Sequence, residues 1–272
     1  MLTRAISGLV FVLLVVVSLL GGFTLALLFF ALVSILGTIE FYKLASSFSN
    51  PYKWNGAMFS ATIILTSGVL AYNPKAIVVL VALVIFLGRF VVRLLKSKSK
   101  TAIVDISVTI SGALYLAIPF VSLLFIGIIS SFDPEQFDWR LPLSIFILTW
   151  VNDTGAYLSG RTFGKTKLFE RISPNKTWEG SIGGLIFTVF GSAVLFHFWP
   201  SFTLVIWAGA AVLISIFANL GDLMESAFKR NAGVKDSGKI MPGHGGILDR
   251  FDAVLLTAPI VFGYFLAIIA FY

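Results

Sequence analysis

The sequence has no cysteine, only two histidines and few charged residues. Without cysteine, the protein has no disulfide scaffold, no thiolate metal site and no cysteine nucleophile. His197 and His244 alone argue against a multi-histidine metal site. Charged residues are 12% of the 272 residues, compared with about 25% in soluble domains. This shortage excludes both a soluble enzyme and a disordered chain.

Hydrophobic residues make up 58% of the sequence and occur in long runs, roughly 18–25 residues being enough to cross a membrane as a helix. We therefore predict an all-α polytopic integral membrane protein with about nine transmembrane helices. The predicted spans are 5–20, 23–42, 56–72, 75–95, 103–131, 141–160, 180–199, 203–228 and 251–271. Segment 103–131 is too long for one simple crossing and contains Pro119, so we interpret it as one long or broken helix, with two short helices as the alternative. We interpret the first run as a helix rather than a signal peptide, because it lacks a clean small-residue cleavage site.

Basic residues are concentrated in three segments between the predicted spans. Segments 89–100, 161–179 and 229–250 hold 15 of the 20 lysines and arginines. The positive-inside rule places all three in the cytoplasm, and the acidic loop 133–138 belongs outside. This predicts a multi-pass protein of the inner cell membrane with a cytoplasmic N-terminus and an external C-terminus. The formal net charge of +7 then reports topology or a phosphate-rich ligand, not nucleic acid.

The composition changes near residue 100, because Glu40 is the only acid before Asp105. We therefore predict that residues 1–100 form transmembrane helices that serve as scaffold or interface. Residues 101–272 are predicted to form the catalytic region, with cytoplasmic loops 161–179 and 229–250.

Two acids lie inside predicted spans, where a charged group is costly and is a functional candidate by default. Asp153 follows Asn152 directly, and Asp222 lies three residues after Asn219. A structural alternative is a buried acid bonded to a neighbouring hydroxyl, or a polar contact between helices. Because both acids lie at span ends next to basic loops, together they indicate a metal site.

The loop that follows the sixth predicted span is rich in glycine, serine, threonine and lysine, a combination that suits phosphate oxygens. It lacks Walker A spacing. A helix beginning near Thr177 would direct its first amides toward an anion. The alternative is an ordinary basic cytoplasmic loop.

The segment 226–252 carries the strongest signal. A topology loop needs cations, but it does not need His244-Gly-Gly followed by Asp249-Arg-Phe-Asp252. The glycines let the backbone approach a ligand. Asp249 and Asp252 are three residues apart and share a helix face, which leaves Arg250 available to a phosphate.

Asp153, Asp222 and Asp249, surrounded by lysines and arginines, predict a magnesium ion that bridges a polyphosphate. No side chain looks like a covalent nucleophile, so the nucleophile would be a second substrate.

The run 226–252 resembles the signature of phosphatidate cytidylyltransferases, also called CDP-diacylglycerol synthases. It matches at Ser226, Lys229, Arg230, Lys235, Asp236, Pro242, His244, Gly245, Gly246, Asp249, Arg250 and Asp252. Upstream, Asn152-Asp153 and the block from Ser173 to Gly180 are also similar to that family, so the resemblance covers roughly 150–255.

The resemblance implies that CTP and phosphatidic acid give CDP-diacylglycerol and pyrophosphate in phospholipid biosynthesis. It implies Mg²⁺ as cofactor and allows a second cation such as K⁺. We also expect a homodimer, with small-residue helix faces at Gly183-Gly184 or Gly21-Gly22 as candidate interfaces and internal packing as the alternative.

The site residues expected on these grounds fall into three groups. The predicted catalytic residues are Asp222, Asp249, Lys176, His244 and Arg250. The predicted substrate contacts are Ser173, Asn175, Thr177, Lys229, Arg230, Lys235, Gly245, Gly246 and Glu179. The predicted metal ligands are Asp222, Asp249 and Asp153.

Two other classes compete with this interpretation. In a transporter or channel, Asp153 and Asp222 would be coupling-ion sites, but we find no repeated halves. A membrane lipid kinase would share the logic of the site and would need a base for its alcohol substrate. A purely structural scaffold would not need segment 226–252.

Overall fold

The computed structural model describes residues 2–238, 240–241 and 245–271, and for residues 2–5 and 78 it describes the backbone alone. The described helices are α1 (Leu2–Leu20), α2 (Gly22–Ala45), α3 (Lys53–Tyr72), α4 (Leu80–Lys96), α5 (Ala102–Gly127), α6 (Arg140–Phe163), α7 (Trp178–Phe198), α8 (Leu204–Asn231) and α9 (Leu248–Phe271), with short 3-10 turns η1 (Ile77–Val79) and η2 (Pro134–Gln136). Strands β1 (Lys167–Phe169) and β2 (Ser173–Thr177) form an antiparallel hairpin between α6 and α7. The hairpin lies inside the segment that we predicted as a loop.

The predicted all-α polytopic class is confirmed. Within the described residues, six helices are long and apolar enough to cross a membrane: α2, α3, α5, α7, α8 and α9. The apolar part of α1 is shorter, and α6 carries a polar run that begins at Asn152. Nine crossings, and the sides on which the termini lie, stay predictions.

The ambiguous segment 103–131 contains one helix, α5, which continues through Pro119. Proline has no N–H to donate to the carbonyl of Tyr115, one turn earlier. Dense packing on both sides of the proline holds the helix together, because Leu116 and Phe120 are both buried.

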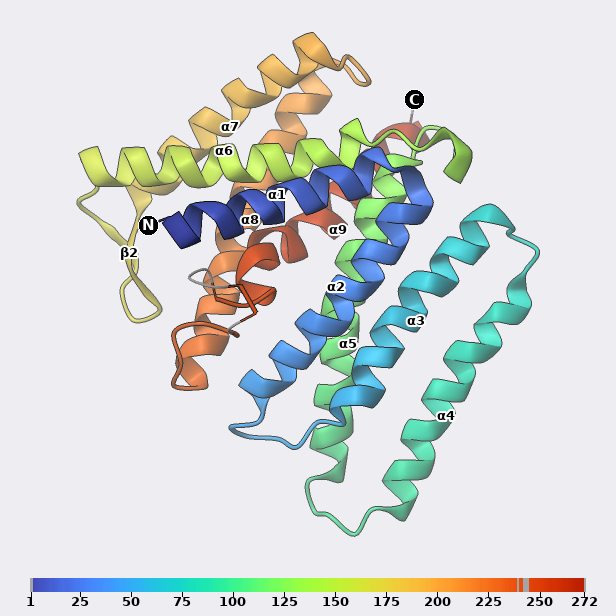
Figure 1. Ribbon diagram of the computed structural model, residues 1–272. Helices are drawn as coiled ribbons and strands as arrows, with labels where there is room; N and C mark the ends of the chain where they lie inside the picture. Colours follow the sequence, from blue (N-terminus) through green and yellow to red (C-terminus); the bar gives the residue numbers. More distant parts are fainter. Residues whose placement is uncertain (1, 239, 242–244, 272) are drawn as a thin grey trace.

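Figure 1 shows α2, α3, α4 and α5 lying side by side, while α6 extends away from the top of this group alongside α7. A second group is formed by α6, α7, α8 and α9, where α6 packs along α7, and α8 packs against α9. Helix α5 contacts α2, α3 and α9 and so joins the two groups. The boundary predicted at residue 100 stays a prediction.

The first turn of α9 is anchored in the apolar core by one aromatic side chain. The ring of Phe251 lies 5.3 Å from that of Phe11, 5.2 Å from Phe120 and 6.1 Å from Phe146, between ring centroids. These partners come from α1, α5 and α6. Edge-to-face contacts of this kind fix the position of the ring, and with it that of the neighbouring Asp252.

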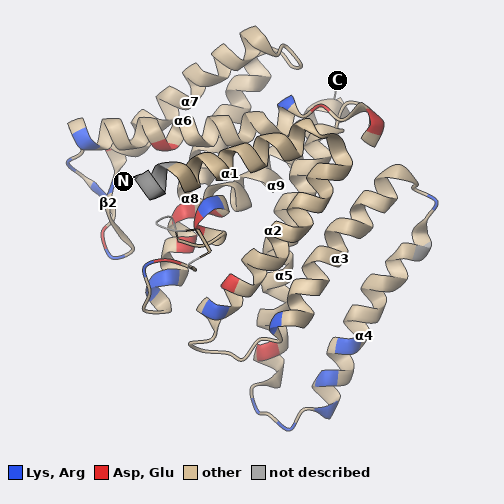
Figure 2. Cartoon of the chain, viewed as in Figure 1, with Lys and Arg blue, Asp and Glu red and all other residues tan. Residues whose placement is uncertain are grey.

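Most lysines and arginines lie toward one end of the molecule, at the lower and left ends of the helices in Figure 2. The acidic loop between α5 and α6 lies at the opposite end. The basic segments and the acidic loop thus lie at opposite ends, as the predicted topology requires. Which end faces the cytoplasm stays a prediction.

One of the two candidate dimer faces packs within the chain. A Cβ atom on Gly183 would collide with Ser159 Oγ, and one on Gly184 would lie 2.8 Å from Asn152 Oδ1, so this pair packs against α6. Gly22 has a φ of +85° and forms the turn between α1 and α2. The Gly21-Gly22 face and the homodimer itself stay predictions.

Candidate active site

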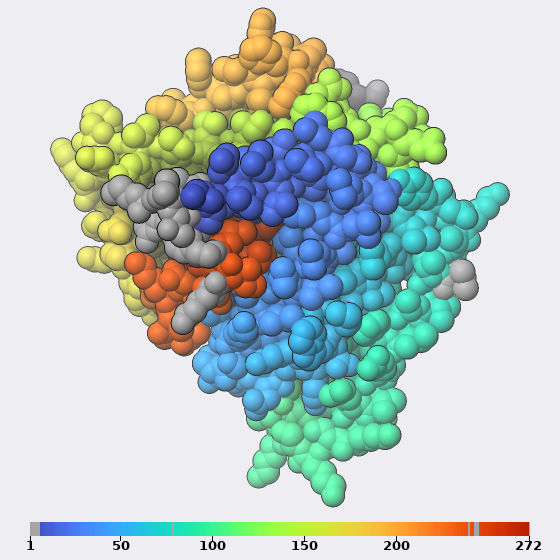
Figure 3. Space-filling view, in the orientation of Figure 1, coloured from blue at the N-terminus to red at the C-terminus, as the bar shows by residue number. Residues whose placement is uncertain are grey.

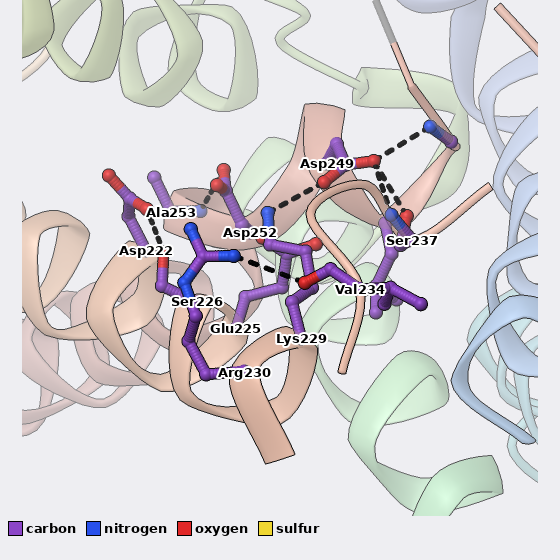
Figure 4. A network of polar contacts seen from close by, with 12 residues as sticks. Asp222, Glu225, Ser226, Lys229, Arg230, Val234, Ser237, Asp249, Asp252 and Ala253 are labelled. Carbon is purple, nitrogen blue, oxygen red and sulfur yellow. Dashed lines mark hydrogen bonds and ion pairs between the residues drawn. The ribbon is translucent and has the colours of Figure 1, made fainter. Parts of the chain in front are cut away.

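Three carboxylates from α8 and α9 meet at one place (Figure 4). One oxygen of each of Asp222, Glu225 and Asp252 lies within 4.8 Å of the others. Asp222 and Glu225 are three residues apart and share a face of α8, while Asp252 lies in the second turn of α9. We call these three residues the acidic cluster. Carboxylate oxygens are the ligands that Mg²⁺ prefers, so the cluster fits a divalent cation.

Glycine makes this approach of the two helices possible. A Cβ atom on Gly221 would lie 2.5 Å from the carbonyl oxygen of Asp252 and 3.2 Å from Ala253 Cα. Both obstacles are backbone atoms, which cannot rotate away as a side chain would. The glycine beside Asp222 therefore sets the separation of α8 and α9 at the cluster.

Lys229 joins Glu225 to Asp249 rather than extending into open space. Its Nζ lies 2.5 Å from Glu225 Oε2 and 2.7 Å from Asp249 Oδ1, and the side chain is only 11% exposed. One buried cation between two carboxylates reduces their mutual repulsion. Its predicted contact with substrate stays a prediction.

Asp249 is hydrogen-bonded to the segment that precedes α9. Its Oδ2 accepts from the Ser237 N–H at 2.9 Å, the Ser237 hydroxyl at 2.8 Å and the Gly246 N–H at 2.7 Å. Gly245, with a φ of +83°, makes the turn that brings the Gly246 amide to this carboxylate. Among the described acids, Asp249 is not a member of the acidic cluster, and its metal role stays a prediction.

A cavity of about 560 Å³ opens beside the cluster, between α6, β2, α7 and α8. The predicted residues that line it are Asp153, Asn175, Lys176, Thr177 and Asp222. The structure therefore places five predicted site residues, from the three elements α6, β2 and α8, around one space.

One ion pair joins the cavity to the acidic cluster. Lys176 Nζ lies 2.6 Å from Asp222 Oδ2 and 3.5 Å from the Asn219 carbonyl oxygen. The other oxygen of Asp222 accepts from the Ser226 hydroxyl at 3.2 Å. Asp222 thus belongs to the cluster and to the cavity at once.

The hairpin and its junction with α7 are held by two further predicted residues. Thr177 caps α7, because its Oγ1 accepts from the Gly180 N–H at 3.1 Å. The Glu179 carboxylate accepts from the N–H groups of Lys165 and Thr166, each at 3.1 Å. In the hairpin, Ser173 pairs with Phe169. The predicted start of the helix near Thr177 is confirmed.

The remaining predicted residues lie around α9 and the end of α8. Arg230 Nη1 donates to the Val234 carbonyl at 3.1 Å and so closes the turn after α8. Lys235 is exposed, and Arg250 is half-buried in the first turn of α9. His244 lies outside the described residues.

Sequence reasoning missed two members of the acidic cluster. Glu225 follows Asp222 at a helical spacing of three, which is a visible signal. Asp252 was noted for sharing a face with Asp249 and as part of the family signature, but not as a metal ligand. The sequence also left the role of Asn152 open. This amide is fully buried, and its Oδ1 accepts from the Ser215 hydroxyl at 2.7 Å. Asn152 therefore ties α6 to α8.

The fold and the site define a polytopic membrane protein with an acidic cluster at the edge of a lysine-containing cavity. A family model described as the cytidylyltransferase family matches residues 2–268. The chain belongs to this family, so the predicted family relationship is confirmed.

Relatives named phosphatidate cytidylyltransferase agree with this assignment. The protein of Staphylococcus haemolyticus (strain JCSC1435) is 53% identical over 121 residues, which are 44% of this chain and 46% of that protein. The protein of Staphylococcus aureus (strain COL) is 40% identical over 167 residues, 61% of each chain. The protein of Staphylococcus epidermidis (strain ATCC 35984) is 38% identical over 167 residues, again 61% of each chain. The matched parts thus span about half to three fifths of these relatives.

Proposed function

We propose that the protein transfers the cytidylyl group of CTP to phosphatidic acid, giving CDP-diacylglycerol and pyrophosphate. The proposed place is the cytoplasmic face of the inner cell membrane, in phospholipid biosynthesis. The observation that carries the proposal is the position of Asp222, which joins the acidic cluster to the cavity through Lys176. The name of the relatives supports the same reaction.

The acidic cluster is the proposed metal site. Asp222, Glu225 and Asp252 would hold the divalent cation, which we take to be Mg²⁺. When bound, the ion would offset the charge of the triphosphate and of the departing pyrophosphate. Asp153 lines the cavity beside this cluster and is the proposed ligand of a further cation such as K⁺.

The chain itself would supply charge and orientation to the transfer. A phosphatidate oxygen forms a bond to the α-phosphorus of CTP, and the bond from that phosphorus to the β-phosphate bridge breaks, releasing pyrophosphate. The phosphate monoester is already mostly ionised near pH 7, since its second pKa is roughly 6. A strong general base is therefore not required. Lys176 and Arg250 would contact phosphates, and Asn175 would contact CTP within the cavity.

The metal role of Asp249 can be separated from a positioning role. Asp252→Asn removes a member of the cluster, while Asp249→Asn removes the partner of Lys229 and Ser237. If both aspartates bind the ion, both variants will require more Mg²⁺ for half-maximal activity. If Asp249 only positions the loop, its variant will lose turnover without a changed requirement for Mg²⁺.

The direct test uses the purified full-length protein in detergent with radiolabelled CTP and phosphatidic acid, with and without Mg²⁺. The expected result is labelled CDP-diacylglycerol and one pyrophosphate per lipid product, dependent on the metal. Release of a nucleoside diphosphate would instead identify a lipid kinase. The absence of any CTP-dependent product would overturn the proposal and favour a transporter.

A further inference from the structure

The first hundred residues contribute one buried acid to the neighbourhood of the candidate site. Glu40 lies in the last turns of α2, and its side chain is fully buried. A carboxylate in such a place is costly unless it accepts hydrogen bonds from groups that need an acceptor. Its partners therefore indicate what it does.

The hydrogen-bond donors found for Glu40 among the described residues lie near the other end of the chain. Its Oε2 accepts from the Leu248 N–H at 2.9 Å and from the Ser237 hydroxyl at 3.3 Å. Leu248 is the first residue of α9, so its N–H has no acceptor within the helix. A carboxylate at this end also interacts favourably with the helix dipole. Glu40 thus caps α9 from a different helix.

The segment before α9 has glycines where it passes this carboxylate. A Cβ atom on Gly238 would collide with Glu40 Oε1, and a Cβ atom on Gly246 would collide with Glu40 Oε2. A residue larger than glycine at either position would therefore force the Glu40 carboxylate or this segment to move. In Figure 3 the orange atoms before α9 lie against the blue atoms of α1 and α2.

The same segment is held from its other side by Asp249. Ser237 donates to both carboxylates, and the Gly246 amide donates to Asp249. Asp252 of the acidic cluster lies four residues, about one helical turn, after Leu248. A shift at the start of α9 would therefore move Asp252 relative to Asp222 and Glu225 on α8.

We propose that Glu40 is a positioning residue that fixes the start of α9 and thereby places Asp252 in the acidic cluster. The proposal rests on the proposed function for its catalytic consequence. If so, the site depends on one side chain from residues 1–100, which we predicted to serve as scaffold or interface.

A labelling experiment tests the contact without any reaction. The chain has no cysteine, and Ile247 is 6% exposed, so Ile247→Cys places a single buried thiol beside the contact. We expect a water-soluble maleimide to label this thiol several-fold faster when Glu40→Ala is added. The matched control is Ser34→Ala, a buried α2 residue whose hydroxyl bonds within its own helix. We expect the control to leave the labelling rate unchanged.

Metal binding and turnover provide the second readout. Glu40→Ala is expected to raise the Mn²⁺ or Mg²⁺ concentration for half saturation about tenfold, and to lower kcat by about ten- to a hundredfold. Glu40→Gln retains an acceptor of the same length and should stay within about threefold of the parent protein. Glu40→Asp retains the charge but is one carbon shorter, so it should behave like Glu40→Ala.

The outcomes separate the two proposals. If the parent protein makes no CDP-diacylglycerol, the proposed function fails, while labelling and Mn²⁺ binding still test Glu40. Equal labelling and equal metal affinity in Glu40→Ala and Ser34→Ala would overturn the positioning role. If Glu40→Ala does not fold, the comparison of Glu40→Asp with Glu40→Gln decides, and equal behaviour of these two would overturn it as well.

Discussion

The contact between α8 and α9 and the helix α4 are built in opposite ways. At the α8–α9 contact, Gly221 lets two backbones approach so that buried acids and Lys229 find partners. Along α4, only Phe90 is buried, and nothing lies within 4 Å of a Cβ atom placed on Gly88. An exposed helix surface needs little precise packing, whereas polar groups inside the protein need defined partners. Geometric precision in this molecule therefore accompanies its buried charged groups.

The largest effect on activity is expected when Asp222, which belongs to both the acidic cluster and the cavity, loses its charge. Asp222→Asn keeps the shape of the side chain but weakens both the cluster and the pair with Lys176. We expect CDP-diacylglycerol formation to fall about 10²–10³-fold, measured with labelled CTP. Glu135→Gln, in the acidic loop at the opposite end, should change it less than twofold. Near-normal activity in a folded Asp222→Asn protein would remove Asp222 from the site.

The next largest effect is expected from Lys176, whose side chain lines the cavity. Lys176→Gln removes the positive charge that faces Asp222, so we expect the KM for CTP to rise about tenfold, with a smaller change in kcat. The measurement is initial rate against CTP concentration. Lys96→Gln, at the end of α4, is the matched control and should leave KM unchanged. Equal KM values in the two variants would show that Lys176 does not contact CTP.

A smaller effect on stability tests the glycine at the helix contact. Gly221→Ala places a methyl group 2.5 Å from the Asp252 carbonyl oxygen, so α8 and α9 must separate. We expect a loss of about 1–3 kcal/mol in stability, seen as a lower Tm in detergent. An unchanged Tm together with unchanged activity would contradict the close contact.

The smallest effect is expected at the equivalent change in α4. Gly88→Ala meets no atom within 4 Å and gains helix propensity. It should leave activity unchanged and either preserve stability or raise it by up to about 1 kcal/mol. A decrease like that of Gly221→Ala, in the same melting assay, would erase the contrast between the two regions.

The helices of this fold could be predicted from sequence because apolar runs and their polar ends are local features. The sequence left open whether 103–131 forms one helix or two, since packing by neighbouring helices decides whether a proline interrupts a helix. The β1–β2 hairpin was missed for a similar reason. Its polar residues are compatible with both a strand and a loop, and the pairing of the two strands is known only from the three-dimensional structure.

The candidate site was predicted in its parts but not in its arrangement. Lys176, Asp153 and Asp222 line one cavity, as their chemistry indicated. Helical spacing placed Asp249 and Asp252 on one face, yet it could not tell which of them meets Asp222, because this depends on how α9 is rotated against α8. Glu40 and Leu248 are 208 residues apart in the sequence, and no local sequence pattern predicts their contact.

Binding of Mn²⁺ to the purified protein, followed by electron paramagnetic resonance, tests the acidic cluster most directly. The account predicts one tight site in the parent protein and in Glu135→Gln, and at least a tenfold loss of affinity in Asp252→Asn and in Glu225→Gln. Undiminished Mn²⁺ affinity in both of these cluster variants would contradict it.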